Sequence, residues 1–336
     1  ASWWWYGMVL CMLMDVISFG DSIADTGNIK YLAAITNQSF PSLFPPYGQT
    51  FFHKPTGRCS DGRLIIDFLA ESLWLPLVPP YMHEGSGNAL KSGYGVNYAV
   101  AGATALGSLF LGEEGIQNPV ANASLGIELG WFKHSLHSIC NNPSGTQKID
   151  LVYGFFFLIS LSIIVLVQEL IEMGAQTLVV PGNFPIGCSS AYLTVCGSKQ
   201  EEYDPITGCL VRLNQFVEYH NEQLQMKSNQ IRELHPYVNI ICANYYNAAM
   251  QIYRFPYKFG FTNGALKACC GGGGEFNYNL TTTSGDESAT VCDEPSTYVN
   301  WDGIHLTEAA YKVIFKGLFR GPYTTPAFSS LCPTLQ

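Results

Sequence analysis

The sequence has few charged residues for its length. Only 13% of its 336 residues are Asp, Glu, Lys or Arg, about half of the usual share of about 25%. The 17 basic residues are outnumbered by 26 acidic ones, so the net charge is −9. We therefore expect no binding of nucleic acid, or of an anionic membrane, through charge. Because 47% of the residues are hydrophobic, the chain can bury a large core.

The sequence also lacks the common signatures of metal and nucleotide sites. Its 11 cysteines include no C-x-x-C pair, and no histidine pattern of a zinc site lies near them. The glycine-rich segment 269–274 has neither the Gly-Lys-Ser/Thr ending of a phosphate loop nor a strand before it. We expect no metal and no cofactor, and interpret this segment as a disulfide-linked loop beside the active site.

Eleven cysteines are many for a cytosolic enzyme, and they favour disulfides formed in an oxidising compartment. The odd count leaves at least one thiol unpaired, and the pairing does not follow from the sequence. Three glycosylation acceptors, at Asn37, Asn122 and Asn279, fit the secretory route. We expect a secreted, extracellular protein; the alternative is the vacuole or another compartment of the secretory pathway.

No lysine or arginine precedes Lys30, and residues 1–14 are apolar and aromatic. A secretion signal needs a basic start, an apolar middle and a small-residue cleavage site, and only the apolar middle is visible. Two interpretations of residues 1–14 stay open: a remnant of a secretion signal, and a buried N-terminal arm.

Residues 151–167 form an uncharged run of 17 residues. This length is at the lower limit for a membrane span of about 20 residues. We interpret the run as a buried strand joined abruptly to a helix, which continues to Met173 and stops at Gly174. A transmembrane helix is the alternative, and we expect no stable membrane insertion.

Short apolar runs alternate with helical patterns along the chain, which is typical of a mainly parallel sheet. Besides the strand and helix of 151–173, strands are expected near 16–18, 95–104, 177–180 and 238–243, and helices near 65–73, 125–139, 213–231 and from 307. Asp61 is expected to cap the helix near 65–73. We assign residues 15–325 to one domain, after the N-terminal segment 1–14 and before a C-terminal tail, 326–336.

Ser22 lies in Phe19-Gly20-Asp21-Ser22, directly after the first apolar run. A serine at the carboxyl end of a buried strand is exposed where open α/β sheets bind their ligands. Gly, Asp and Ser are also ordinary turn residues, so this block alone would indicate only a turn.

Asp302 and His305 lie three residues apart near the other end of the chain. A serine hydroxyl is a weak nucleophile until a base takes its proton, and the base needs a third group to orient it. Asp302 and His305 could be this pair, although alone they would indicate hydrogen bonding at a helix start. His220, on the apolar face of helix 213–231, is expected to be a partly buried face residue rather than a base.

The blocks 19–28, 56–81, 95–104, 177–188 and 301–306 together resemble the plant GDSL esterase/lipase family of the SGNH hydrolase superfamily. The resemblance extends from Val16 to about Lys316. It implies a three-layer α/β/α sandwich with a flavodoxin-like, mainly parallel sheet. It also implies a secreted, monomeric enzyme that hydrolyses small-molecule carboxylic esters without a metal or cofactor.

Transferred residue by residue, the resemblance implies that Ser22 is the nucleophile, His305 the base and Asp302 the group that orients the base. The backbone N–H groups of Ser22 and Gly102 would bind the oxyanion. The small residues around Gly102 are also compatible with a purely structural role in tight strand–helix packing.

One family element is missing from the sequence. In the family, a Gly-x-Asn-Asp element follows the strand near 151, and its asparagine side chain is a third oxyanion donor. No such tetrapeptide occurs between Leu151 and Gly174. Two functions therefore stay open: an ester hydrolase that is impaired by the loss of this donor, and a weak or inactive relative that binds an ester, lipid or glycan.

Overall fold

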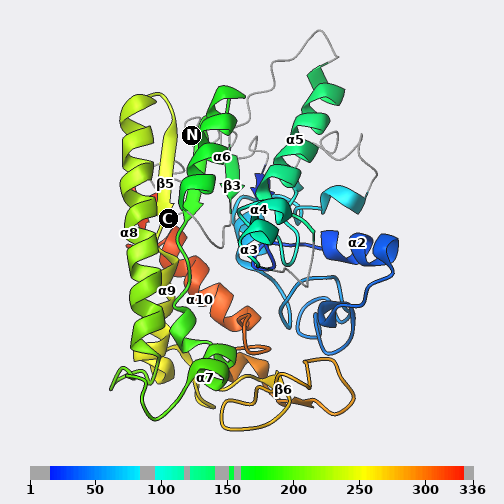
Figure 1. Cartoon of the computed structure of the whole chain (residues 1–336), viewed down its shortest axis with the longest axis vertical. Coiled ribbons are helices and arrows are strands. Elements are labelled where there is room, and N and C mark those ends of the chain that lie inside the picture. Colours follow the sequence, from blue (N-terminus) through cyan, green and yellow to red (C-terminus); the bar gives the residue numbers. More distant parts are fainter. Residues whose placement is uncertain (1–15, 84–94, 117–121, 141–150, 155–159, 329–336) are drawn as a thin grey trace, which may run out of the picture.

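The computed structural model describes residues 16–83, 95–116, 122–140, 151–154 and 160–328 (Figure 1). Residues 1–14 lie outside this part of the chain, so both interpretations of that segment stay open. Most of the predicted tail, 326–336, lies outside it as well.

A six-stranded sheet forms the centre of the fold. Its order is β2-β1-β3-β4-β5-β8, with bounds Gly95–Asn97, Val16–Phe19, Leu151–Gly154, Thr177–Pro181, Asn239–Ala243 and Thr324–Thr325. The first five strands are parallel, and β8 pairs with β5 in the antiparallel direction. The order 2-1-3-4-5 is that of flavodoxin, which confirms the predicted flavodoxin-like sheet.

Helices cover both faces of this sheet. The described helices are α2 (Asn28–Thr36), α3 (Ile65–Ser72), α4 (Ser108–Glu113), α5 (Leu125–Cys140), α6 (Ser160–Glu172), α7 (Ser190–Cys196), α8 (Val211–Leu234), α9 (Tyr245–Arg254) and α10 (Glu308–Phe319). The long α8 runs along one side of the molecule (Figure 1). A small hairpin pairs β6 (Cys270–Gly271) with β7 (Thr290–Val291).

The alternation of side chains along the strands explains why a hydrophobic core lies on each face of the sheet. On β1, Val16 packs in a core with residues of α3, α9 and α10, and the next residue, Ile17, packs in a core with residues of α5, α6 and α8. On β4, Val179 packs in the first of these cores and Leu178 in the second. Because successive side chains of a strand point to opposite faces, each apolar strand serves both cores, and the predicted three-layer sandwich is confirmed.

The uncharged run is a strand followed by a helix, as predicted. Its first residues form β3, residues 155–159 lie outside the described part, and α6 begins at Ser160. Gly174 follows α6 with a φ of +100°, and its N–H donates to the carbonyl of Ile171, so it ends the helix. Among the described residues, no helix is both long and apolar enough to span a membrane.

The prediction that Asp61 caps α3 was wrong. The N–H of Leu64, which precedes α3, donates to the carboxylate of Asp67 in the first turn of the helix (2.9 Å). Asp61 instead accepts the N–H of Glu308, the first residue of α10, at 2.7 Å. The helix therefore caps itself from within, and Asp61 joins its loop to α10, a contact between residues 247 positions apart.

Two disulfides lie within the described part of the chain. Cys188 pairs with Cys209, and Cys269 pairs with Cys292 across the β6–β7 hairpin. The second bond confirms that the glycine-rich segment is disulfide-linked. Cys59, Cys196, Cys242 and Cys270 are free within the described part of the chain.

Candidate active site

Ser22 lies in one helical turn at the carboxyl end of β1. The N–H groups of Ala24 and Asp25 both donate to the carbonyl of Asp21, at 3.0 and 2.9 Å. Gly20, between strand and turn, has a φ of +132°, a conformation that residues with a side chain rarely adopt. The abrupt end of the strand therefore leaves Ser22 only partly buried, above the sheet.

Asp302 and His305 lie in a tight loop before α10. One carboxylate oxygen of Asp302 accepts the backbone N–H groups of Ile304 (3.0 Å) and His305 (2.9 Å). Gly303 has a φ of +100°, and a Cβ at this position would lie 2.3 Å from the ring of Tyr278. The loop therefore requires glycine here, and it fixes both side chains.

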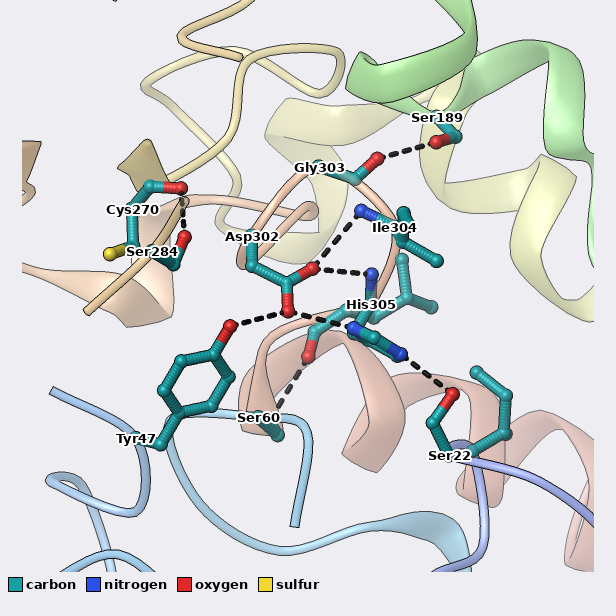
Figure 2. A network of polar contacts seen from close by, with 12 residues as sticks. Ser22, Tyr47, Ser60, Ser189, Cys270, Ser284, Asp302, Gly303, Ile304 and His305 are labelled. Atoms are coloured by element: carbon teal, nitrogen blue, oxygen red, sulfur yellow. Dashed lines mark hydrogen bonds and ion pairs between the residues drawn. The ribbon is translucent and has the colours of Figure 1, made fainter. Parts of the chain in front are cut away.

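Ser22, His305 and Asp302 form a continuous chain of contacts (Figure 2). The hydroxyl of Ser22 lies 2.7 Å from Nε2 of His305, 283 positions away in sequence. Nδ1 of the same imidazole lies 2.7 Å from Oδ2 of Asp302. With a proton on Nδ1, the imidazole donates to Asp302 and accepts from Ser22. This is the geometry that a base needs to remove the serine proton.

Asp302 and His305 each favour the charged form of the other. Burial opposes ionisation of Asp302, but the neighbouring His305 and the hydrogen bonds to the carboxylate lower its pKa to about 2. Burial also opposes a charged His305, but Asp302 outweighs it and raises the pKa of the imidazole above its ordinary value. Asp302 is thus ionised at neutral pH, and its charge stabilises the protonated form of the His305 imidazole.

A cavity of about 200 Å³ opens beside Ser22. Its walls are mainly apolar and include Ile23, Phe184 and Ile304, and Gly102 borders it together with Ser22. Gly102 has a φ of +82°, so glycine suits this position for conformational reasons. His220 is buried on α8 and does not line the cavity, as predicted. The described residues contain no group of His, Cys, Asp and Glu that could hold a metal ion.

Comparison with known proteins identifies the family. The model of the family described as GDSL-like Lipase/Acylhydrolase matches residues 16–139 and 160–318. The chain belongs to this family. GDSL esterase/lipase At1g31550 of Arabidopsis thaliana is 50% identical over 345 residues, which cover 95% of this chain and 86% of the relative. Sinapine esterase of Brassica napus is 46% identical over 346 residues, which cover 95% of this chain and 88% of that protein.

The family match is interrupted where the sequence lacks the Gly-x-Asn-Asp element. It stops at residue 139 and resumes at residue 160, the first residue of α6. The alignment with At1g31550 has 345 positions, which is more than this chain has residues, although it includes only 95% of the 336 residues here. Some residues of this GDSL relative therefore have no counterpart in this chain. The position that would follow β3, residues 155–159, lies outside the described part of the structure.

Buried polar residues join the Ser22 turn to the segment of Gly102. Asp25 is fully buried, and its carboxyl accepts the N–H groups of Gly27, Asn28, Ile29 and Ala101 at 2.7 to 3.0 Å. The amide of Asn28 donates to the carbonyls of Asn97 and Ala99 at 2.8 and 2.9 Å. Our sequence analysis missed Asp25 and Asn28, although both follow Ser22 within the same motif.

Glu128 of α5 lies beneath the Ser22 turn. It is fully buried, and its Oε2 accepts the N–H of Gly20 at 2.7 Å. Its other oxygen has no hydrogen-bond partner among the described residues. The nearby N–H of Val100 donates instead to the carbonyl of Gly20 (2.9 Å). Burial, together with the charges of Asp21 and Asp25, raises the pKa of Glu128 well above its ordinary value, so the neutral carboxyl is favoured.

The three glycosylation acceptors lie on the surface. Asn37, Asn122 and Asn279 are all exposed. Their accessibility is compatible with glycosylation, which stays a prediction.

We predict that Glu128→Gln becomes increasingly stabilising as pH rises. In the unfolded chain Glu128 loses its proton near pH 4.5, but in the folded protein it keeps the proton to a higher pH. Between pH 4.5 and the higher pKa of the folded protein, the free energy of unfolding of the wild type should therefore fall as pH rises. The slope for one proton is at most about 1.4 kcal/mol per pH unit. The glutamine variant has no such proton, so its free energy of unfolding should exceed that of the wild type by a margin that grows with pH.

Denaturant unfolding at several pH values measures this margin. Asp21 and Asp25, whose pKa values burial raises to about 6, titrate in both proteins, so the difference between the two proteins reports Glu128 and its coupling to these two acids. Glu172→Gln, at an exposed position of α6, is the matched control. A margin for Glu128→Gln that does not change with pH would contradict a protonated Glu128.

Proposed function

We propose that this GDSL family member hydrolyses carboxylic esters of small molecules through an acyl-enzyme on Ser22. The observation that carries the proposal is the continuous contact from Ser22 through His305 to Asp302, at 2.7 Å in each step. The cavity beside Ser22 supports it, because mainly apolar walls suit an uncharged ester.

The geometry supports a two-step reaction. Nε2 of His305 takes the proton of Ser22 while the serine oxygen bonds to the ester carbonyl carbon. The resulting tetrahedral intermediate expels the alcohol, which receives that proton from His305, and an acyl-enzyme remains. A water molecule then gives its proton to His305 and attacks the acyl carbon. Collapse of the second intermediate releases the acid and returns the proton to Ser22. Asp302 keeps its charge throughout and stabilises the imidazolium.

The oxyanion of each intermediate would be bound by the backbone N–H groups of Ser22 and Gly102. Support for this role is the position of both residues on one cavity. The family's asparagine donor has no counterpart that we can identify in the sequence. Since the loss of one such donor costs roughly 10²–10³ in rate, we infer a slow enzyme rather than an inert one.

A catalytically inactive relative that binds an ester, lipid or glycan is the second candidate. The interruption of the family match at residues 140–159 favours it, because the third donor belongs to that region. The Ser22–His305 contact favours the hydrolase, since a protein that only binds has no need of an activated serine.

We further propose that the protein is secreted and acts as a monomer, with the vacuole as the alternative location. Two disulfides and three exposed glycosylation acceptors support passage through an oxidising compartment. The acyl and alcohol groups of the substrate are to be found with a panel of esters read by mass spectrometry. The panel should include sinapine, because one relative is named sinapine esterase.

We predict that Ser22→Ala abolishes hydrolysis of a short-chain nitrophenyl ester and leaves the fold intact. The substitution removes the nucleophile from a partly exposed turn and leaves the core unchanged. Ser296→Ala, at an exposed position outside the cavity, is the control. If Ser22→Ala kept the wild-type rate at an equal folded fraction, the assignment of Ser22 would be wrong.

We predict that kcat/KM rises with pH in a single step that reflects His305. The imidazole must be neutral to accept the serine proton. Because Asp302 raises the pKa of His305, the step should lie above the ordinary histidine value of about 6.5. Asp302→Asn should move the step down and slow the reaction. A flat profile between about pH 5 and pH 9 would contradict a histidine base.

We predict that a Gly-x-Asn-Asp loop of family length, inserted after Phe157, raises the rate by about 10² at an equal folded fraction, because it restores one oxyanion donor. The matched control is the same insertion with alanine in place of the new asparagine, and it should show no gain. Equal rates for the uninserted chain and the asparagine insertion, both well folded, would refute the missing-donor account. Another residue, for example from the loop at Asn183, would then fill that position.

A further inference from the structure

Tyr47 contacts Asp302 from the side opposite to the serine. Its hydroxyl donates to Oδ2 of Asp302 at 2.8 Å, although the two residues are 255 positions apart in sequence. The same oxygen accepts from Nδ1 of His305 at 2.7 Å. Figure 2 shows the phenol on one side of the carboxylate and the imidazole on the other. The chain of contacts therefore has a fourth member.

The surroundings of Tyr47 hold this hydroxyl in place. Its side chain is 3% exposed, and its ring packs edge-on against Trp301, the residue before Asp302, with ring centroids 5.7 Å apart. The N–H of Gly48, the residue after Tyr47, donates to the carbonyl of Ser60 (3.0 Å). The side-chain hydroxyl of Ser60 donates in turn to the carbonyl of Leu306, the residue after His305 (3.0 Å). The loop of Tyr47 is thus fastened to the loop of His305.

The phenol stays protonated in this environment. Burial, followed by the negative charge of Asp302, raises the pKa of Tyr47 well above its ordinary value of 10.0. It can therefore only act toward the carboxylate as a donor. A donor to a carboxylate spreads its negative charge and weakens the attraction of that oxygen for other protons.

We propose that Tyr47 is a positioning residue of the proposed catalytic site: it fixes the carboxylate of Asp302 and limits how strongly Asp302 holds the imidazolium of His305. The proposal depends on the proposed function for its kinetic consequence but not for its geometry. Too strong an attraction would keep His305 charged at neutral pH, and a charged imidazole cannot take the serine proton.

Other ionisable groups face the pair and must stay unchanged in a test. Asp21 lies on the Ser22 side and favours a charged His305. The thiols of Cys59 and Cys270 and the phenols of Tyr278 and Tyr311 lie within electrostatic range of Asp302. Tyr47 differs from these four because its hydroxyl is hydrogen-bonded directly to the carboxylate.

The test is Tyr47→Phe, which removes the hydroxyl and keeps the ring against Trp301. The control is Tyr298→Phe, which makes the same change at a partly buried residue that packs against the buried cluster of Tyr47, Cys269, Cys270 and Trp301. The hydroxyl of Tyr298 is not among the hydrogen-bond partners of Asp302. We expect Tyr47→Phe to lower kcat on the order of tenfold with little change in KM, because the variant removes a hydrogen bond that orients a reacting group and leaves substrate contacts unchanged; partners that orient metal ligands have effects of this size. The pH step of kcat/KM should also move up.

A second readout needs no substrate. The proton between His305 and Asp302 should give a low-field ¹H NMR resonance, and in Tyr47→Phe it should move further downfield as the bond to the imidazole strengthens. An unchanged resonance and an unchanged pH step would overturn the proposal, whether or not kcat falls, because packing alone would then explain the residue. If the wild type hydrolyses no ester, the proposed function fails, and the resonance still decides the role of Tyr47.

Discussion

The carboxylate of Asp302 is the group on which the geometry of the site depends. It accepts two backbone N–H groups within its own loop, the imidazole of His305 and the phenol of Tyr47. The two backbone bonds fix the orientation of the carboxylate, and the carboxylate in turn fixes the ring of His305 against Ser22. Since His305 and Ser22 come from opposite ends of the chain, this contact also needs the parallel sheet, which places the end of β1 next to the loop before α10.

Burial acts differently on the acidic groups of this region. Asp25 accepts four backbone N–H groups, yet burial raises its pKa to about 6. Asp302 is also buried, but the neighbouring imidazole can carry a positive charge, and its pKa is lowered to about 2. A countercharge thus decides whether the pKa of a buried acid is raised or lowered. Asp302 is the ionised partner of the His305 imidazole, whereas Glu128, with no cation beside it among the described residues, favours the neutral form beneath the Ser22 turn.

Local patterns predicted much of the fold, and the combination of two short blocks with the family resemblance identified Ser22, His305 and Asp302. The apolar runs predicted the five parallel strands but not β8, β6 or β7. The block around Ser22 and the Asp302–His305 pair are short motifs that are recognisable without a structure. Tyr47 was missed because it lies in a proline-rich loop without periodicity, 255 positions from its partner. Glu128 was missed because its burial depends on how α5 packs on β1. Asp61 was assigned to the nearest helix, whereas it accepts the N–H of Glu308 at the start of α10, and only the tertiary fold brings them together.

The central claim is that Ser22 is activated by His305 even though the family's asparagine donor is missing. The most direct measurement is the rate of covalent modification by a fluorophosphonate as a function of pH, with the modified peptide identified by mass spectrometry. Our account predicts a single modified residue, Ser22, and a rate that rises with pH through the step of His305 and is greatly reduced in a His305→Ala variant. A wild-type protein that is folded but not modified at Ser22, or modified there equally fast without His305, would contradict it.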